Sequence, residues 1–453
     1  MYMYQVDPFR ARLVMRYPRF VEYSKKALDE VAASLIEELL VQGRMSTVQC
    51  VLSTVEQIQQ RKEREVTSAQ RDDRYTCRQA VIESFRRLVS GGYIERAKEI
   101  SDEWHTQELE FEGLPKAKKA RVEANVPEED PTVVALLQGG QYKMLNRDAV
   151  WRVNISMFHD SLRAVSLGLL VSQRFGHKVQ SSGSLVTAAL KLAAHKRHAD
   201  GAVDDDSRWA FAVSDITRYI PKAVLQGFEK RPGGAAINIF KSLMKLTTMT
   251  HPSALAEFEV ADARPEHAKF QVATNKLLQH LQDRIIHQLI LDSYGEVAAR
   301  ICVILLQNGH LEADAIAEAA TVPIKDTREI LHKLYRANYI TLFNINQAKQ
   351  HNPSNMLYMW AISRDRMLRT VNDTVNTCLL NMRLRRQHEV EIGKEWIERA
   401  KEAGATDENE NEIDKLNYRK FCQGLERLDN AILQLDETLM ALHDYSIIGA
   451  HGS

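Results

Sequence analysis

Few residues in this sequence have the types and spacing that catalysis requires. His388 and Glu389 begin like the zinc motif H-E-x-x-H, but the fifth position is Ile392, so the second histidine ligand is missing. No serine lies in a G-x-S-x-G turn, and the glycine pairs lack the lysine or further glycines of a phosphate-binding loop. We therefore predict a protein with no active site and no cofactor of its own.

Histidines and cysteines give no convincing metal site either. His195 and His198 lie one helical turn apart and could share a metal, but Lys196 and Arg197 between them favour a solvated basic helix face. The cysteines form no C-x-x-C pair and fall in or near apolar helical stripes, which indicates reduced, buried thiols: Cys50, Cys77, Cys302, Cys378 and Cys422.

Basic residues on two predicted helices are the stronger candidates for function, as contacts to DNA or to a partner protein. In each case they project away from an apolar stripe: Arg78, Arg86 and Arg87 on one helix, and Lys325, Arg328, Lys333 and Arg336 on the other. In helix-turn-helix folds such a third helix can enter the major groove. The alternative is a face that merely stays solvated. Because no array of Asn or Gln accompanies these cations, we expect no sequence-specific readout.

The length and the net charge of the chain indicate its number of domains and its attraction to nucleic acid. A chain of 453 residues should hold several domains, and 60 basic against 60 acidic residues give no global attraction to nucleic acid. Any contact with DNA must therefore come from local patches, as in a subunit of a larger assembly. No apolar run of 18 residues is present in the sequence, so we expect no membrane span.

The elements that carry the second basic cluster form one small module at residues 297–362. An apolar helical face ends at Asn308-Gly309, an Ala-rich helix follows, and a third helix begins after Pro323. Two β-rich runs at residues 339–343 and 356–362 are joined by a polar loop. Three helices followed by two strands are typical of a winged helix.

The same order of elements recurs before this module, and a helical hairpin follows it. Ser46 is a good cap for a helix in the earliest copy, and we read residues 147–175 and 270–294 as helical runs that flank a further copy. After residue 362 apolar residues alternate at three and four: Leu368, Val371, Val375, Cys378 and Met382, then Leu425, Leu428, Ile432, Leu435, Leu439 and Leu442. We expect the second set to dock the hairpin on a partner.

We therefore predict a mainly α fold with small β wings: tandem winged-helix domains followed by an antiparallel coiled-coil hairpin. The division we expect is a lead-in at 1–20, a winged helix at 21–113, a charged linker at 114–131, a helical segment plus winged helix at 132–275, a winged helix at 276–365, the hairpin at 366–447 and a tail at 448–453.

These stretches resemble one family, the third-largest subunit of RNA polymerase III, which is related to the large subunit of the transcription factor TFIIE. Three stretches carry the resemblance: residues 13–20 with 35–43; Trp151-Arg152-Val153-Asn154 with Phe158-His159, similar to the helical entry of a winged helix; and Arg300 to Leu306 with His310, Pro323, Lys325 and Leu357-Tyr358. Family members usually carry a further winged helix first. Here a possible last strand at Tyr4 to Val6 stands in its place, through truncation or loss in this lineage.

The resemblance implies a non-catalytic nuclear subunit that sits on the clamp of the largest polymerase subunit. It would form a heterotrimer with two smaller subunits, contact DNA without sequence specificity, and aid promoter opening for transfer RNA, 5S and other short RNAs. Two other readings compete. One is a helical and winged-helix scaffold of a proteasome-lid-like complex, although that class places helical repeats before a single winged helix. The other is a self-standing DNA-binding regulator, which a net charge of zero disfavours.

Overall fold

The computed structural model describes residues 12–65, 73–97, 149–176, 179, 181–200, 210–248, 255–259, 268–346, 356–395, 398 and 412–444. They belong to two compact units, one of residues 1–162 and 190–202 and the other of residues 163–189 and 203–453. The suggested strand at Tyr4 to Val6, the charged linker and the C-terminal tail lie outside the described residues. The limits predicted for the individual domains stay a prediction.

The first unit contains a winged helix preceded by helical turns. Its elements are η1 (Val14–Arg16), α2 (Tyr17–Ala27), α3 (Glu30–Gln42), β1 (Met45–Ser46), α4 (Thr47–Glu65), α5 (Asp73–Ser90), β2 (Ile94–Arg96) and β3 (Val150–Val153). Ser46 caps α4 as predicted: its Oγ accepts from the Gln49 amide at 3.3 Å, and the Gln49 side chain accepts from the Ser46 amide at 3.1 Å. The helix C-terminus before β1 is closed by Gly43, whose φ of 79° favours glycine.

Strand β3 corrects the helix that we predicted from residue 147. Residues 150–153 lie between β1 and β2 in an antiparallel sheet, with Trp151 opposite both Met45 and Arg96. The burial of Trp151 and Val153, with Val150 exposed, follows a strand period of two. The Trp151 indole also donates to Thr47 Oγ1 at 2.8 Å. The segment that resembles the helical entry to a winged helix is thus the central strand of the module before it.

The second unit repeats this plan. Helices α9 (Val213–Ile216), α10 (Lys222–Glu229) and α11 (Gly234–Thr248) accompany β4 (Phe211–Ala212), β5 (Leu255–Glu259) and β6 (Lys269–Val272), and the strand order is β4-β6-β5. The helix predicted over residues 270–294 is again partly wrong, because residues 269–272 are the central strand β6 and α12 covers only Thr274–Tyr294. Phe270 is buried in that strand against Phe211 and Phe240.

The third winged helix matches the predicted elements closely. It consists of α13 (Glu296–Asn308), α14 (Ala313–Ala320), α15 (Ile324–Arg336), β7 (Thr341–Asn346) and β8 (Met356–Ala361). Gly309 ends α13 with a φ of 78°. Leu311 forms a single antiparallel β-bridge with Trp360 of β8, and β7 pairs with the other edge of β8. The last strand of the module is therefore central, as it is in the two earlier sheets.

In each of these modules the last strand is central and runs into a long helix. Within the described residues, β3 is followed by α7 (Ile155–Phe175), β6 by α12, and β8 by α16 (Arg364–Ile392). The helix α8 (Ser182–Asp200) precedes β4, as α3 precedes β1. The mainly α fold with small β wings is thus confirmed.

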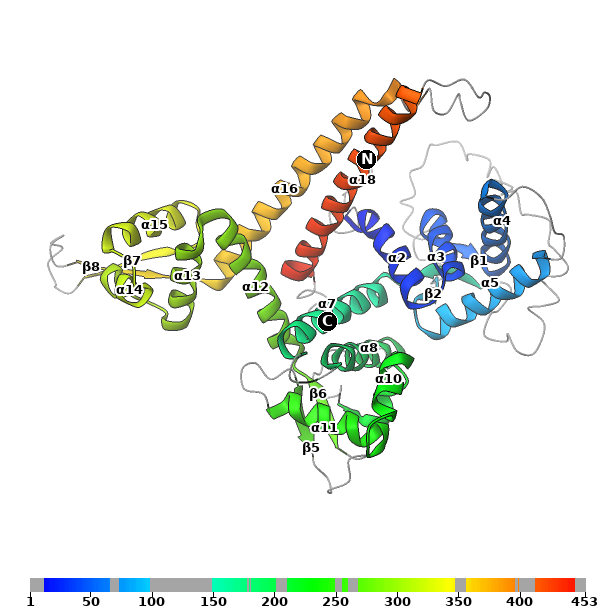
Figure 1. Cartoon of the computed structure of the whole chain (residues 1–453), viewed down its shortest axis with the longest axis horizontal. Helices are drawn as coiled ribbons and strands as arrows, with labels where there is room; N and C mark the ends of the chain where they lie inside the picture. Colours follow the sequence, from blue (N-terminus) through cyan, green and yellow to red (C-terminus); the bar gives the residue numbers. More distant parts are fainter. Residues whose placement is uncertain are drawn as a thin grey trace, which may run out of the picture. The chain divides into compact units, whose positions relative to one another are not determined.

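The hairpin is formed by α16 and α18 (Glu412–Leu439), which continues as the π-helix η6 (Met440–Asp444); Figure 1 shows the two long helices side by side. The buried residues of α16 are Met367, Val371, Val375 and Leu379. The predicted register was therefore wrong at Cys378, which is exposed, because the stripe continues at a spacing of four into Leu379.

Candidate nucleic-acid and partner surfaces

The cations predicted on α5 lie against acidic side chains of their own unit. The Arg87 guanidinium donates to the Asp29 carboxylate at 2.7 Å, and Asp29 also caps α3 by accepting from the Ala32 amide at 2.6 Å. Arg86 donates to Glu83 at 2.6 Å, and this hydrogen bond lowers the pKa of Glu83. Arg78 is half-buried. The contact of Arg87 with Asp29 ties α5 to α3, whereas the Arg86–Glu83 pair lies within α5. A role of these cations in DNA binding stays a prediction.

The cations predicted on α15 are exposed to solvent. Arg328 lies 3.4 Å from Asp314 and Lys333 lies 2.8 Å from Glu329, and all four of these side chains are at least 59% exposed. Pairs this exposed contribute little to stability, so their cations can exchange a carboxylate for a phosphate. Lys325 and Arg336 are exposed as well. The structure thus leaves the basic face of α15 in solvent, as the sequence predicts.

The leucine stripe of α18 is covered in large part by its own unit. Ile432, Leu439 and Leu442 are buried, whereas Leu425, Leu428 and Leu435 are half-buried. Gln282 of α12 closes the base of the hairpin, because its Nε2 donates to the carbonyls of Ala441 and Leu442 at 3.3 and 3.1 Å. Docking of this stripe on a partner stays a prediction, and the buried members already serve the hairpin itself.

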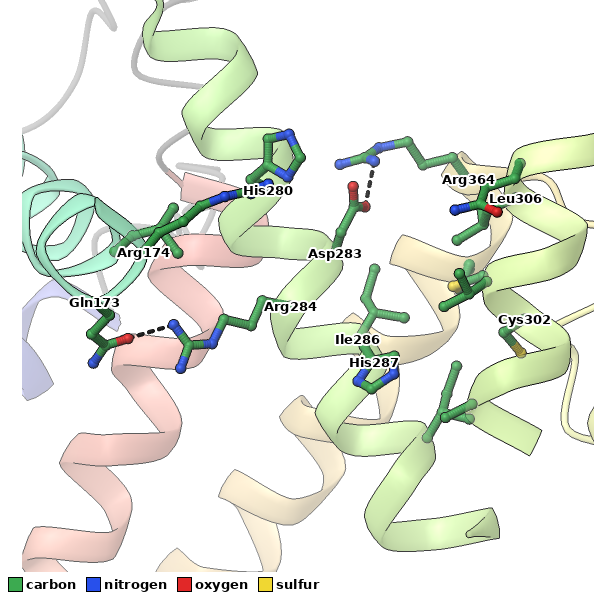
Figure 2. Close-up of a pocket in the computed structure, with 16 residues that line it drawn as sticks. Gln173, Arg174, His280, Asp283, Arg284, Ile286, His287, Cys302, Leu306 and Arg364 are labelled. Atoms are coloured by element: carbon green, nitrogen blue, oxygen red, sulfur yellow. Dashed lines mark hydrogen bonds and ion pairs between the residues drawn. The ribbon is translucent and has the colours of Figure 1, made fainter. Parts of the chain in front are cut away.

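A groove that sequence reasoning missed lies in the second unit. Its floor is one face of α12, and its walls are the C-terminal part of α7 on one side and α13 with the start of α16 on the other (Figure 2). The cavity measures about 780 Å³. Ile286 and Ile290 are buried at its floor, while Leu306 on α13 remains 45% exposed. This volume is in the usual range for a ligand-binding cleft.

Charged groups surround this apolar floor. Arg364 is paired with Asp283, and Arg284 donates to the neutral side-chain amide of Gln173; both contacts appear as dashed lines in Figure 2. Arg174 lies beside His280, whose pKa is lowered first by burial and then by the positive charge of Arg174. The arginines lining the groove outnumber its carboxylates by three to one. Because the Arg364 and Asp283 charges cancel, Arg174 and Arg284 are the two other cations of the lining.

Two interpretations of single residues need correction. Arg197 and His198 do not lie on a solvated basic face: their side chains are 23% and 22% exposed, and both bind the buried carboxylate of Asp160, at 3.3 and 3.2 Å. Cys50 and Cys302 are buried as predicted, and burial raises the pKa of each thiol to about 12. Cys77 and Cys422 are only half-buried.

Within the described part of the chain, no three His, Cys, Asp or Glu side chains gather closely enough to hold a metal ion. No described helix combines the length and the apolar character needed to cross a membrane.

Comparison with known proteins gives matches over the third winged helix and over nearly the whole chain. A family model described as "POLR3C, C-terminal winged-helix domain" matches residues 286–362. The chain is 21% identical over 494 residues to "DNA-directed RNA polymerase III subunit RPC3" of Rattus norvegicus, covering 98% of this chain and 85% of that protein. The corresponding protein of Homo sapiens is 19% identical with the same coverage, and that of Danio rerio is 22% identical over 95% of this chain and 82% of its own length.

Proposed function

Because the chain belongs to the family of RNA polymerase III subunit RPC3, we propose that it is a non-catalytic subunit of DNA-directed RNA polymerase III. One observation carries the proposal: similarity to that subunit extends over 98% of a chain whose described part holds successive winged helices and a terminal helical hairpin. Nuclear localisation follows from the proposal.

In this role the chain forms a heterotrimer with two smaller subunits on the clamp of the largest subunit. There it aids promoter opening and the start of transcription of transfer RNA, 5S ribosomal RNA and other small RNAs. The fold supports an accessory role, since winged helices present helix and wing surfaces to DNA or protein and need no reactive group.

Affinity purification of the tagged chain from its own cells tests the assignment. We expect the largest RNA polymerase III subunits and two small partners to copurify in fixed proportion. Recovery of proteasome-lid subunits, or of the chain alone after mild extraction, would contradict the proposal and leave only the winged-helix architecture.

The DNA contact of this subunit is proposed to run through α15. Each phosphate contact contributes about 0.9 to the slope of log K against log salt, so loss of four contacts lowers the slope by up to about 3.6. We expect the fourfold alanine variant of Lys325, Arg328, Lys333 and Arg336 to show this fall in a duplex-binding titration.

The comparison variant Arg86→Ala/Arg87→Ala removes two cations that are already paired with Glu83 and Asp29. It should leave the salt slope nearly unchanged and instead loosen the contact between α5 and α3. If the salt slope falls for this variant and not for the α15 variant, the DNA contact lies on α5 of the first module and not on α15.

A further inference from the structure

The groove on α12 combines two features that the described residues do not satisfy among themselves. Leu306 stays 45% exposed above the buried floor, and Arg284 has a neutral partner where a carboxylate would bind more strongly. Arg174 lies on the Arg284 side of α12, next to His280, and Leu306 lies across α12 on α13 (Figure 2). Apolar surface and positive charge thus line the same groove.

We propose that this groove binds an acidic amphipathic segment of a partner protein. A bulky apolar side chain of that segment packs on Leu306 and Val303, and its flanking carboxylates pair with Arg174 and Arg284. Neutral His280 adds a hydrogen-bonding group without further charge. Charge complementarity selects the segment, and the apolar anchor supplies most of the contact area.

The lining favours a protein segment over a nucleic acid. Among the described residues that line the groove there is no Phe, Tyr or Trp on which a base could stack. Phosphates and riboses would also cover Leu306 and Val303 without gaining from apolar contact, whereas a leucine or phenylalanine side chain would gain from it. Arg364 is already neutralised by Asp283, so few cations remain to follow a phosphate backbone.

This inference rests on the proposed function only in supposing that the chain has subunit partners. It assigns to one partner a site and a chemistry: alternating acidic and apolar residues at helical spacing. The groove is separate from the basic face of α15, so variants can address one surface at a time.

The test uses the purified full chain and a fluorescent synthetic peptide with Asp or Glu and Leu or Phe at helical spacing. We expect binding by fluorescence anisotropy, weakened at least about tenfold by Arg174→Glu/Arg284→Glu. The variant Leu306→Asp, which alters an exposed side chain, should weaken binding similarly. Lys325→Glu/Arg336→Glu is the matched control, since it makes the same charge change on the same unit and should leave binding unaltered.

Several results would overturn the proposal. These are no binding by the wild-type chain, equal losses in the groove variants and the α15 control, or tight single-stranded DNA binding that the groove variants abolish while the peptide binds poorly. If the peptide binds as expected but the chain purifies without polymerase subunits, the proposed function is refuted and the proposed peptide site stands. If the polymerase copurifies but no peptide binds, the peptide site is refuted and the proposed function stands.

Discussion

Substitution of Gly168 by alanine probes a close contact between helices α7 and α8. A Cβ atom at Gly168 would overlap Thr187 Oγ1 and lie 2.9 Å from the carbonyl oxygen of Gly183. At Gly183 a Cβ would in turn overlap the Gly168 carbonyl and lie 2.7 Å from the Ser172 Cβ. Helices α7 and α8 thus meet backbone to backbone, and only glycine fits at this crossing.

The expected magnitude follows from three opposing terms. Alanine favours a helix over glycine by about 0.5–1 kcal/mol. Overpacking a buried contact costs roughly 1–3 kcal/mol. Displacing Thr187 also breaks its hydrogen bond to the Ala164 carbonyl, 3.2 Å long, which contributes about 0.5–1.5 kcal/mol. We therefore expect Gly168→Ala to destabilise the packing of α7 on α8 by about 2 kcal/mol.

Hydrogen exchange by mass spectrometry measures the local stability of α7 and α8. A global melting curve does not isolate it, because the chain has several domains. The protected amides of α7 and α8 should exchange about thirtyfold faster in Gly168→Ala, since 1.4 kcal/mol is about tenfold. Gly424→Ala on α18 is the control, because no atom lies within 4 Å of its added Cβ. It should slow exchange in α18. Unchanged exchange in α7 and α8 would refute the backbone contact.

Three further predictions concern the second unit. Gln282→Ala leaves two buried carbonyls of η6 without their donor, so η6 should lose about 1–3 kcal/mol of protection in hydrogen exchange; normal protection would disprove that link. A neutral alkylating reagent should modify exposed Cys378 in the native chain before Cys302, whose pKa burial raises to about 12, and equal rates would contradict this order. The hydrogen bond from Lys333 lowers the pKa of Glu329 below its ordinary 4.5, so this pair stabilises α15 above that pH and is lost as the pH falls through the lowered pKa. Glu329→Gln should abolish that acid-dependent rise in α15 exchange, and a persistent rise would assign it elsewhere.

The sequence predicted the helices well and the central strands poorly. The third winged helix could be predicted because Gly309 and Pro323 separate its helices, and because its strands are rich in β-branched and aromatic residues. Strands β3 and β6 were read as helix because each is four residues long and runs directly into an apolar helix. Their pairing partners lie far away in sequence, as with Trp151 and Met45, and no local period reports such a contact.

The candidate surfaces divide in the same way. The exposed basic face of α15 could be predicted, since all its members belong to one helix. The pairing of Arg87 with Asp29 could not, because the two residues are 58 positions apart. The groove was missed for the same reason: Arg174 and Arg364 come from helices remote in sequence, and the polar positions 280, 284 and 287 on α12 were the one local signal.

Helix α12 follows the central strand β6, and it both forms the floor of the groove and holds the hairpin. One end of this helix continues from β6, while Gln282 and Asp283 on it both bind Arg364 at the start of α16. The same arginine is therefore a wall of the groove and an anchor of the hairpin. Because Gln282 also holds the carbonyls of η6, both ends of the hairpin sequence are fixed to the helix that forms the floor of the groove. A segment bound in the groove would therefore contact the helix to which both ends of the hairpin are hydrogen-bonded.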